Sequence, residues 1–212
     1  MKLQLALDVT DKKKALELCE KIKYYIDIIE LGTPFIKIFG MKELIKDFKK
    51  FKIPILTDLK TMDTGYFEAE LAFKFGADYS TVCATSYEGT IKGTIKAAKD
   101  YKKKSVVDLI GRKDVKKAAL QIIKEKPNYI AIHSGIDMQM KGIKPLKTLK
   151  ELSKVIDSKK IAVAGGINIE TIEDIAKYKP GIIIVGGAIT KAKNPLKVVK
   201  ELKRIMKKYE NR

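Results

Sequence analysis

The sequence predicts a single (β/α)8 TIM barrel of the α/β class, a closed ring of eight parallel strands surrounded by helices. Short β-branched apolar runs alternate with segments whose apolar residues recur at helical spacing, and this alternation occurs eight times with a period of roughly 25 residues. The strands are apolar on both faces, as expected where helices cover a parallel sheet. With 212 residues and 45% apolar content, the chain has room for one such barrel. We therefore expect one domain that spans residues 1–212.

The predicted elements follow one another at even intervals. The strands cover residues 3–8, 26–31, 53–57, 78–83, 105–109, 128–133, 161–164 and 181–185. Apolar residues at helical spacing mark helices within residues 15–22, 41–48, 66–75, 91–98, 115–122, 146–152 and 196–202. Gly32-Thr33-Pro34 predicts a turn, residues 134–139 a polar loop, Asn168 the cap of a short helix, and Asn194-Pro195 the start of the last helix. No Gly-x-Gly-x-x-Gly follows the first strand, which argues against an open dinucleotide-binding sheet.

The chain carries a formal net charge of +18, which raises nucleic-acid binding as an alternative function. Lysines are spread over every predicted helix, whereas base reading favours Arg, Asn and Gln on one presented element. We therefore expect no specific nucleic-acid partner and a positive field that attracts a small anionic substrate. No apolar run is long enough to span a membrane and no signal peptide is present, which predicts no membrane association and a cytoplasmic protein. The two cysteines, Cys19 and Cys83, have neither disulfide nor zinc-site spacing.

Ionisable residues recur at the carboxyl ends of the predicted strands. They are Asp8, Glu30, Asp58, Lys60, Asp108 and His133. In a barrel these ends converge on one rim, where barrel enzymes carry out their chemistry. Side chains two apart on a strand share a face, so Asp58 and Lys60 should point the same way. Taken alone, this stretch fits a buried ion pair followed by Asp63 as a helix N-cap. The ring of ionisable ends favours a functional site, because each group costs desolvation energy unless it is paired or bound to metal.

Paired glycines follow the last two predicted strands, as Gly165-Gly166 and Gly186-Gly187. Barrel enzymes bind phosphate at this position, where the loops and a short helix offer backbone N–H groups to the anion. Glycine lacks the Cβ atom that would block a close approach. Either pair alone could simply form a turn, but two pairs at the two expected strands predict a phosphate site.

The carboxylate cluster suits a hard divalent cation such as Mg2+, which prefers oxygen ligands and keeps several waters. One histidine and no cysteine pair argue against zinc, and against barrel epimerases that bind metal through two histidines. A metal and a lysine beside a phosphosugar can stabilise an enediolate, and His133 is the candidate general base for a proton next to a carbonyl. The alternative for His133 is a structural histidine at a strand end.

These segments resemble the orotidine 5′-phosphate decarboxylase suprafamily and, within it, the 3-hexulose-6-phosphate synthase family. The similarity covers nearly the whole chain. The Asp-x-Lys-x-x-Asp element from Asp58 to Asp63 is typical of the suprafamily, and the Gly-Thr-Pro and Ala-Gly-Gly segments narrow the match to the synthases. The matching pieces are Leu5-Ala6-Leu7-Asp8, residues 29–34, residues 58–63, Val107-Asp108-Leu109, His133-Ser134-Gly135 with Asp137 and Gln139, residues 162–166 and residues 185–189.

The resemblance implies roles for the strand-end residues. Glu30 and Asp58 would hold Mg2+, and Lys60 would stabilise the enediolate. Asp8 would contact substrate or orient the lysine. Asp108, as a strand-end acid on the same rim, is a further candidate for substrate binding beside the paired glycines. The implied reaction is the reversible aldol addition of formaldehyde to D-ribulose 5-phosphate, which gives D-arabino-hex-3-ulose 6-phosphate.

The resemblance also implies a homodimer with shared active sites, in which Asp63 reaches into the site of the neighbouring subunit. The helix that follows supports an additional covering surface, because it is apolar on two faces. Phe67, Leu71 and Phe75 form one face, and Tyr66, Ala69 and Phe73 form nearly the opposite one.

A sister family, the 3-keto-L-gulonate-6-phosphate decarboxylases, shares the Asp-x-Lys-x-x-Asp element and is the alternative. That family carries an arginine three positions after the histidine, where this chain has Ile136, which favours the synthase. Two positions depart from the usual synthase pattern. Phe39 stands where an acid commonly precedes Gly40, and residues 83–88 differ from the usual small and acidic loop. These departures concern loop contacts and efficiency.

Overall fold

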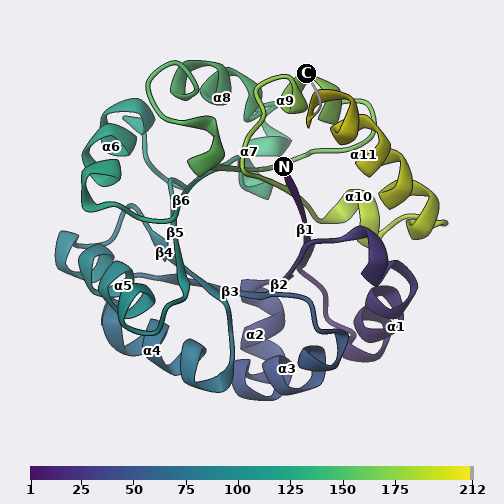
Figure 1. Ribbon diagram of the computed structural model, residues 1–212, viewed down its shortest axis with the longest axis horizontal. Coiled ribbons are helices and arrows are strands. Elements are labelled where there is room, and N and C mark those ends of the chain that lie inside the picture. Colours follow the sequence, from purple (N-terminus) through teal and green to yellow (C-terminus); the bar gives the residue numbers. More distant parts are fainter. Residues whose placement is uncertain (211–212) are drawn as a thin grey trace.

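The computed structural model, which describes residues 1–210, is a closed barrel whose strands follow the order of the chain. Each strand pairs in parallel with the next, and β8 pairs with β1 to close the ring. Figure 1 shows this ring at the centre, with the helices around it. The strands are β1 (Lys2–Leu7), β2 (Ile28–Leu31), β3 (Ile55–Thr61), β4 (Tyr79–Cys83), β5 (Lys104–Asp108), β6 (Tyr129–His133), β7 (Ile161–Ala164) and β8 (Ile182–Val185).

Helices follow every strand and cover the outside of the barrel. They are α1 (Lys12–Ile22), α2 (Thr33–Phe39), α3 (Met41–Phe48), α4 (Gly65–Phe75), α5 (Glu88–Asp100), α6 (Val115–Ile122), α7 (Ile136–Met140), α8 (Leu146–Leu152), α9 (Ile172–Ala176), α10 (Gly187–Thr190) and α11 (Pro195–Glu210). Short 3-10 helices are η1 (Lys23–Tyr25), η2 (Lys49–Phe51), η3 (Ile123–Glu125) and η4 (Ser158–Lys160). None of the helices described is both long and apolar enough to span a bilayer.

The predicted barrel is confirmed, and seven of its strands begin and end within two residues of the predicted bounds. The third strand runs on to Thr61. Three short α-helices, α2, α7 and α10, lie at residues where no helical segment was predicted. The helix α2 begins in the Gly32-Thr33-Pro34 segment that we interpreted as a turn, because proline fits the first turn of a helix as well as it fits a turn. The helix α7, within the predicted loop, has only five residues and too little length for periodicity to be visible.

The two predicted helix caps have different outcomes. Asn194 caps α11, because its side-chain oxygen accepts the backbone N–H of Lys197 at 3.0 Å. Asn168 does not cap α9 directly. Its oxygen accepts the N–H groups of Glu170 and Thr171, at 2.9 and 3.0 Å, in a turn that precedes the helix. The helix itself begins at Ile172.

Apolar side chains form two packed layers that support the polar rim. The larger layer lies between strands and helices, and the smaller one fills the inside of the barrel. The inner layer consists of Ile28, Leu56, Tyr79, Val106, Ala131, Ala162 and Ile182. Because Leu56 faces inward, strand alternation turns Asp58 inward as well. The carboxyl ends of the strands therefore stand on an apolar floor.

Candidate active site

Four of the strand-end residues form one connected chain of contacts at the carboxyl rim. The Lys60 ammonium pairs with Asp58 Oδ2 on the same strand and lies 3.8 Å from Asp108 Oδ2 on β5. Asp108 Oδ2 is also 2.8 Å from Nδ1 of His133, the last residue of β6. Three strands that are distant in sequence thus place an acid, a base and a cation within one continuous polar group.

The carboxylate of Asp58 is held by two threonines that were not among the predicted site residues. The Thr33 hydroxyl, at the start of α2, shares its one hydrogen between the Asp58 carbonyl oxygen at 2.6 Å and Asp58 Oδ2 at 3.0 Å. Thr81 Oγ1, on β4, donates to Asp58 Oδ1 at 2.9 Å. Asp58 is only 3% exposed, so these bonds replace the water that a carboxylate would otherwise bind. Thr33 belongs to the Gly-Thr-Pro segment, which could have drawn attention to it, whereas Thr81 belongs to no recognised sequence motif.

Lys60 and His133 both have pKa values above their usual ones. Burial alone would lower the pKa of Lys60, but the charges of Asp58 and Asp108 outweigh burial and raise it. Burial would likewise lower the pKa of His133, and the hydrogen bond and charge of Asp108 raise it instead. Lys60 is therefore a permanent cation at neutral pH, while the charge of His133 responds to pH.

Glu30 lies beside this group in a buried position. Gln4 Nε2 donates to Glu30 Oε2 at 2.5 Å, and Glu30 Oε1 accepts no hydrogen bond from the residues described. Burial, followed by the charges of Asp58 and Asp8, raises the pKa of Glu30 well above its usual value. The Gln4 oxygen has no partner of its own within residues 1–210, so this inner amide serves Glu30 through its nitrogen alone.

Asp8 directly follows β1 and lies close enough to Glu30 for their charges to interact. Asp8 as a whole residue is exposed, but its carboxylate lies against the backbone of Gly32. A Cβ atom on residue 32 would come within 2.1 Å of Asp8 Oδ1. Burial and the charge of Asp58 raise the pKa of Asp8, while Lys60 and His133 oppose that shift. Glycine at position 32 is thus required for this placement of Asp8.

Glu30 and Asp58 are the carboxylates at this rim that would bind a divalent cation. Within residues 1–210, no three His, Cys, Asp or Glu side chains are grouped as a preformed metal site. Mg2+ commonly uses one or two carboxylates and takes its remaining ligands from water and substrate. Glu30 and Asp58 supply that number of oxygen ligands, and the pKa of Glu30 is raised by burial and then by the charges of Asp58 and Asp8, which a cation would offset. Their donor set fits Mg2+.

The paired glycines lie at the ends of the neighbouring strands β7 and β8. Gly165 and Gly166 have φ angles of +116° and +64°, which favour glycine, and a Cβ at Gly165 would come within 2.4 Å of the Ser134 carbonyl oxygen. Gly186 directly precedes the short helix α10. A Cβ at Gly186 or Gly187 would meet no atom closer than 3.4 Å, so internal packing does not demand glycine there.

Among the ionisable residues predicted for the site, Asp63 is the one with no observed contact or charge interaction with the others within the part of the chain described. It is exposed, and its Oδ1 accepts the backbone N–H of Thr64 at 2.8 Å. Asp63 is also not the N-cap of α4, since Thr64 occupies that position with φ +51°. Of the two apolar faces of α4, Ala69 and Phe73 are buried, whereas Phe67 remains 57% exposed.

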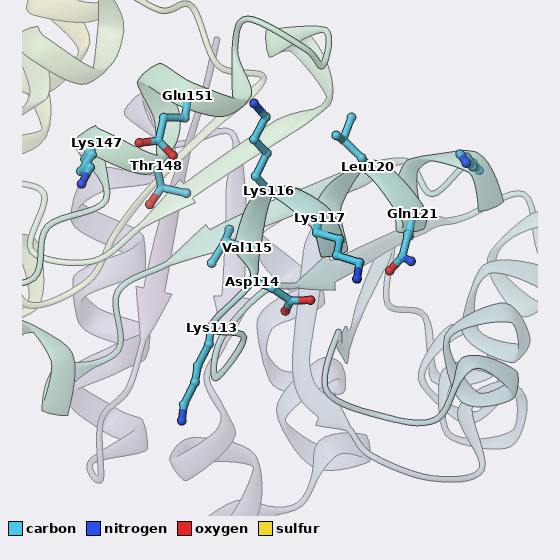
Figure 2. A pocket seen from close by; sticks show the side chains of 11 residues that line it. Lys113, Asp114, Val115, Lys116, Lys117, Leu120, Gln121, Lys147, Thr148 and Glu151 are labelled. Atoms are coloured by element: carbon cyan, nitrogen blue, oxygen red, sulfur yellow. The ribbon is translucent and has the colours of Figure 1, made fainter.

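A large groove lies outside the barrel, between α6 and α8. Figure 2 shows its lysine-rich walls, with Lys113, Lys116 and Lys117 on one side and Lys147 on the other. Asp114 and Glu151 also line this groove of about 940 Å3, so its charge is mixed. None of the predicted site residues borders it, and the rim cluster remains the candidate active site.

The fold and the rim cluster together define a class of protein. Ionisable side chains joined at the carboxyl ends of a closed (β/α)8 barrel are the arrangement of the barrel enzymes, which carry out their chemistry at this face. The family model of the Orotidine 5′-phosphate decarboxylase / HUMPS family matches residues 1–202. The chain belongs to this family.

Individual relatives agree with the family assignment. The 3-hexulose-6-phosphate synthase of Staphylococcus aureus (strain NCTC 8325 / PS 47) is 39% identical over 204 residues, which cover 95% of this chain and 96% of the relative. The crystal structure of 3-hexulose-6-phosphate synthase from Salmonella typhimurium is similar at a TM-score of 0.94, with 37% identity and coverage of 99% and 100% of the two chains. The crystal structure of KGPDC from Streptococcus mutans is more distant, at 26% identity and a TM-score of 0.82 over 98% of both chains.

Proposed function

We propose that this one-domain barrel enzyme is an aldehyde-lyase of the 3-hexulose-6-phosphate synthase type, which adds formaldehyde reversibly to D-ribulose 5-phosphate in the cytoplasm. The product of the forward reaction would be D-arabino-hex-3-ulose 6-phosphate. The observation that carries this proposal is the continuous contact from Asp58 through Lys60 and Asp108 to His133. The names of the relatives support an enzyme of this type.

In this proposal His133 removes the proton from C1 of D-ribulose 5-phosphate. An ionised carboxylate only accepts hydrogen bonds, so the Asp108 contact keeps the proton of neutral His133 on Nδ1 and leaves Nε2 as the base. The electrons of the broken C1–H bond form an enediolate, whose C1 attacks the carbon of formaldehyde. The formaldehyde oxygen then takes a proton, and His133, which holds the proton removed from C1, can return it.

Lys60 supports the same step electrostatically. Its ammonium stands between two carboxylates, which keep it charged and oriented, so it can stabilise the negative oxygens of the enediolate. Glu30 and Asp58 would hold Mg2+, which when bound would supply further stabilisation of that charge. Asp8 would contact the substrate from the β1 side of the rim.

The phosphate of the sugar would bind at the glycines of β7 and β8. The open space beside Gly186 and Gly187 and the backbone N–H groups at the start of α10 are suited to an anion. A phosphate bound there would lie across the barrel mouth from Asp58, with the reactive carbons between them. The positive net charge of the chain would attract this substrate, without a specific nucleic-acid partner.

We further propose a homodimer in which Asp63 completes the site of the partner subunit. Asp63 is exposed and free to reach outward, and the exposed Phe67 follows it on the outer face of α4. Mixing Lys60→Ala and Asp63→Ala proteins tests the sharing directly. Each should be inactive alone, whereas random exchange of subunits should restore about a quarter of the wild-type activity. No recovery after verified exchange would exclude shared sites.

The central test is incubation of the protein with D-ribulose 5-phosphate, formaldehyde and Mg2+, following the loss of formaldehyde. Formaldehyde should disappear with wild-type protein and persist with Lys60→Ala. The second candidate reaction is decarboxylation, as in the 3-keto-L-gulonate-6-phosphate decarboxylases, because the chain is also similar to KGPDC. If formaldehyde persists while 3-keto-L-gulonate 6-phosphate releases carbon dioxide, the decarboxylase is the correct function. Ile136, where that family has arginine, favours the first outcome.

A further inference from the structure

The strand β3 contains an irregularity at the site itself. Thr57 is paired with Ser80 and Thr61 with Val82, so three residues of β3 lie opposite the single residue Thr81 of β4. β3 thus has two residues more than β4 in this interval. Because side chains alternate between the two faces of a strand, two extra residues leave the later side chains on their original faces, whereas one extra residue would reverse them. Asp58 and Lys60 therefore both turn toward the barrel interior, where Thr81 also lies.

The irregularity leaves Lys60 in a left-handed backbone conformation, with φ +47°. This region is unfavourable for a residue with a Cβ atom, so surrounding contacts must hold it. The Lys60 N–H donates to Thr81 Oγ1 at 2.9 Å in place of a bond along the strand ladder. The Lys60 carbonyl oxygen accepts from Cys83 Sγ at 3.4 Å. Both contacts come from β4.

The Thr81 hydroxyl makes two bonds that depend on each other. Its single hydrogen is donated to Asp58 Oδ1 at 2.9 Å, and its oxygen accepts the Lys60 N–H. One side chain, itself 5% exposed, thereby ties the backbone of the lysine to the carboxylate with which that lysine is paired.

We propose that Thr81 is a positioning residue, whose hydroxyl sets the relative placement of the Lys60 ammonium and the Asp58 carboxylate for the reaction. The inference rests on the proposed aldol function for its kinetic test, but the geometric claim is independent of the reaction. Thr81 would act through other residues, because its hydroxyl bonds the Lys60 backbone and the Asp58 carboxylate.

Substitutions at Thr81 separate positioning from packing. Thr81→Val keeps the shape and removes the hydroxyl, while Thr81→Ser keeps the hydroxyl and removes the methyl group. We expect Thr81→Val to lower kcat at least about tenfold with KM for the phosphosugar within about threefold, and Thr81→Ser to stay within about threefold of wild type in both. A packing role predicts the reverse order, with serine worse than valine.

Thr57→Val is the matched control, because Thr57 is a buried threonine on β3 whose hydroxyl bonds only the Tyr79 carbonyl oxygen. Its kcat should remain within about threefold of wild type. If Thr81→Val fails to fold, Thr81→Ala compared with Thr81→Ser isolates the hydroxyl and carries the same expectation. Equal kcat in that pair, or full activity in Thr81→Val, would overturn the proposal.

Crystal structures of the Thr81 variants give a readout that does not depend on turnover. The ion pair between Lys60 and Asp58 should be lost in Thr81→Val and retained in Thr81→Ser. An intact pair in Thr81→Val would refute the positioning role. Should the wild-type protein leave formaldehyde unconsumed, the proposed reaction fails while this comparison still decides the role of Thr81.

Discussion

The contact between Asp108 and His133 gives the sharpest prediction about catalysis. Asp108→Asn replaces the accepting oxygen with an N–H donor at nearly the same place, while the other oxygen can still accept the Ile110 N–H at 2.9 Å. His133 would then accept at Nδ1 and carry its proton on Nε2, which is the wrong tautomer for a base directed at the substrate. The fold is retained, but the base is lost.

The size of the effect follows from the geometry. The bond of 2.8 Å is charge-assisted, and such a bond contributes about 1.5–3 kcal/mol, or roughly a 10- to 100-fold rate effect. Reversal of the tautomer adds to this, and in triads where an acid orients a histidine the amide variant loses about 10⁴ in kcat. We expect kcat for formaldehyde consumption to fall by about 10²- to 10⁴-fold, with a much smaller change in KM.

The pH dependence supplies a second readout of the same variant. The pKa of His133 is raised chiefly by Asp108, so the acid limb of the rate profile should move to lower pH in Asp108→Asn. The charged pair stabilises the fold below the ordinary histidine pKa of about 6.5, and this contribution is lost as the pH rises through the raised value. The variant should therefore lose more unfolding free energy at about pH 5.5 than at about pH 8.5.

A matched control is Asp78→Asn at the opposite end of the barrel. Asp78 accepts the backbone N–H of Ile55 at 3.0 Å and pairs with Lys103, so its substitution tests an acid-to-amide change away from the rim. It should reduce stability without changing kcat. If Asp108→Asn keeps kcat within about threefold of wild type, or if its acid limb does not move, Asp108 does not set the tautomer of His133.

Further predictions concern residues around the same rim. Gly32→Ala should lower the free energy of unfolding by about 1–3 kcal/mol and displace the Asp8 carboxylate, since its Cβ would come within 2.1 Å of Oδ1; a denaturation midpoint equal to wild type would contradict this. Gly186→Ala should leave the melting temperature nearly unchanged and raise KM for the phosphosugar at least about tenfold, and an unchanged KM would place the phosphate elsewhere. Glu30→Gln should stabilise the metal-free protein at neutral pH by on the order of 1 kcal/mol, because the raised pKa of Glu30 means that its contribution is present at low pH and is lost as the pH rises. Urea unfolding across pH measures this, and a variant that is less stable at neutral pH would oppose it.

The barrel was predictable because its signals are local and repeated. Seven of the strands contain β-branched residues and the longer helices carry an apolar stripe, so errors at single boundaries did not alter the number of strand–helix units. Helix ends were less visible. Gly76 marks the end of α4 in the expected left-handed conformation, but Lys52 and Lys126 adopt the same conformation after η2 and η3 with no glycine to reveal it.

The rim cluster was predictable only in part. Strand ends converge in any barrel, so Asp58, Lys60, Asp108 and His133 could be expected on one face from their spacing alone. Their contacts depend on the register between β3 and β4, which arises from strand pairing and has no sequence signature. Thr81 is a threonine in the middle of a strand and could not be distinguished from any other β-branched residue.

Asp58 and Glu30 have different surroundings, so the two carboxylates would play different roles in binding a cation. Asp58 accepts from Lys60, Thr33 and Thr81, so both of its oxygens are fixed in direction. Glu30 has a single donor in Gln4, and burial together with the charges of Asp58 and Asp8 raises its pKa and so disfavours its ionised form. An incoming cation would therefore gain orientation from Asp58 and would relieve electrostatic repulsion at Glu30. Asp58→Asn should consequently disturb the geometry of Lys60, whereas Glu30→Gln should weaken cation affinity and leave the Lys60 contacts in place.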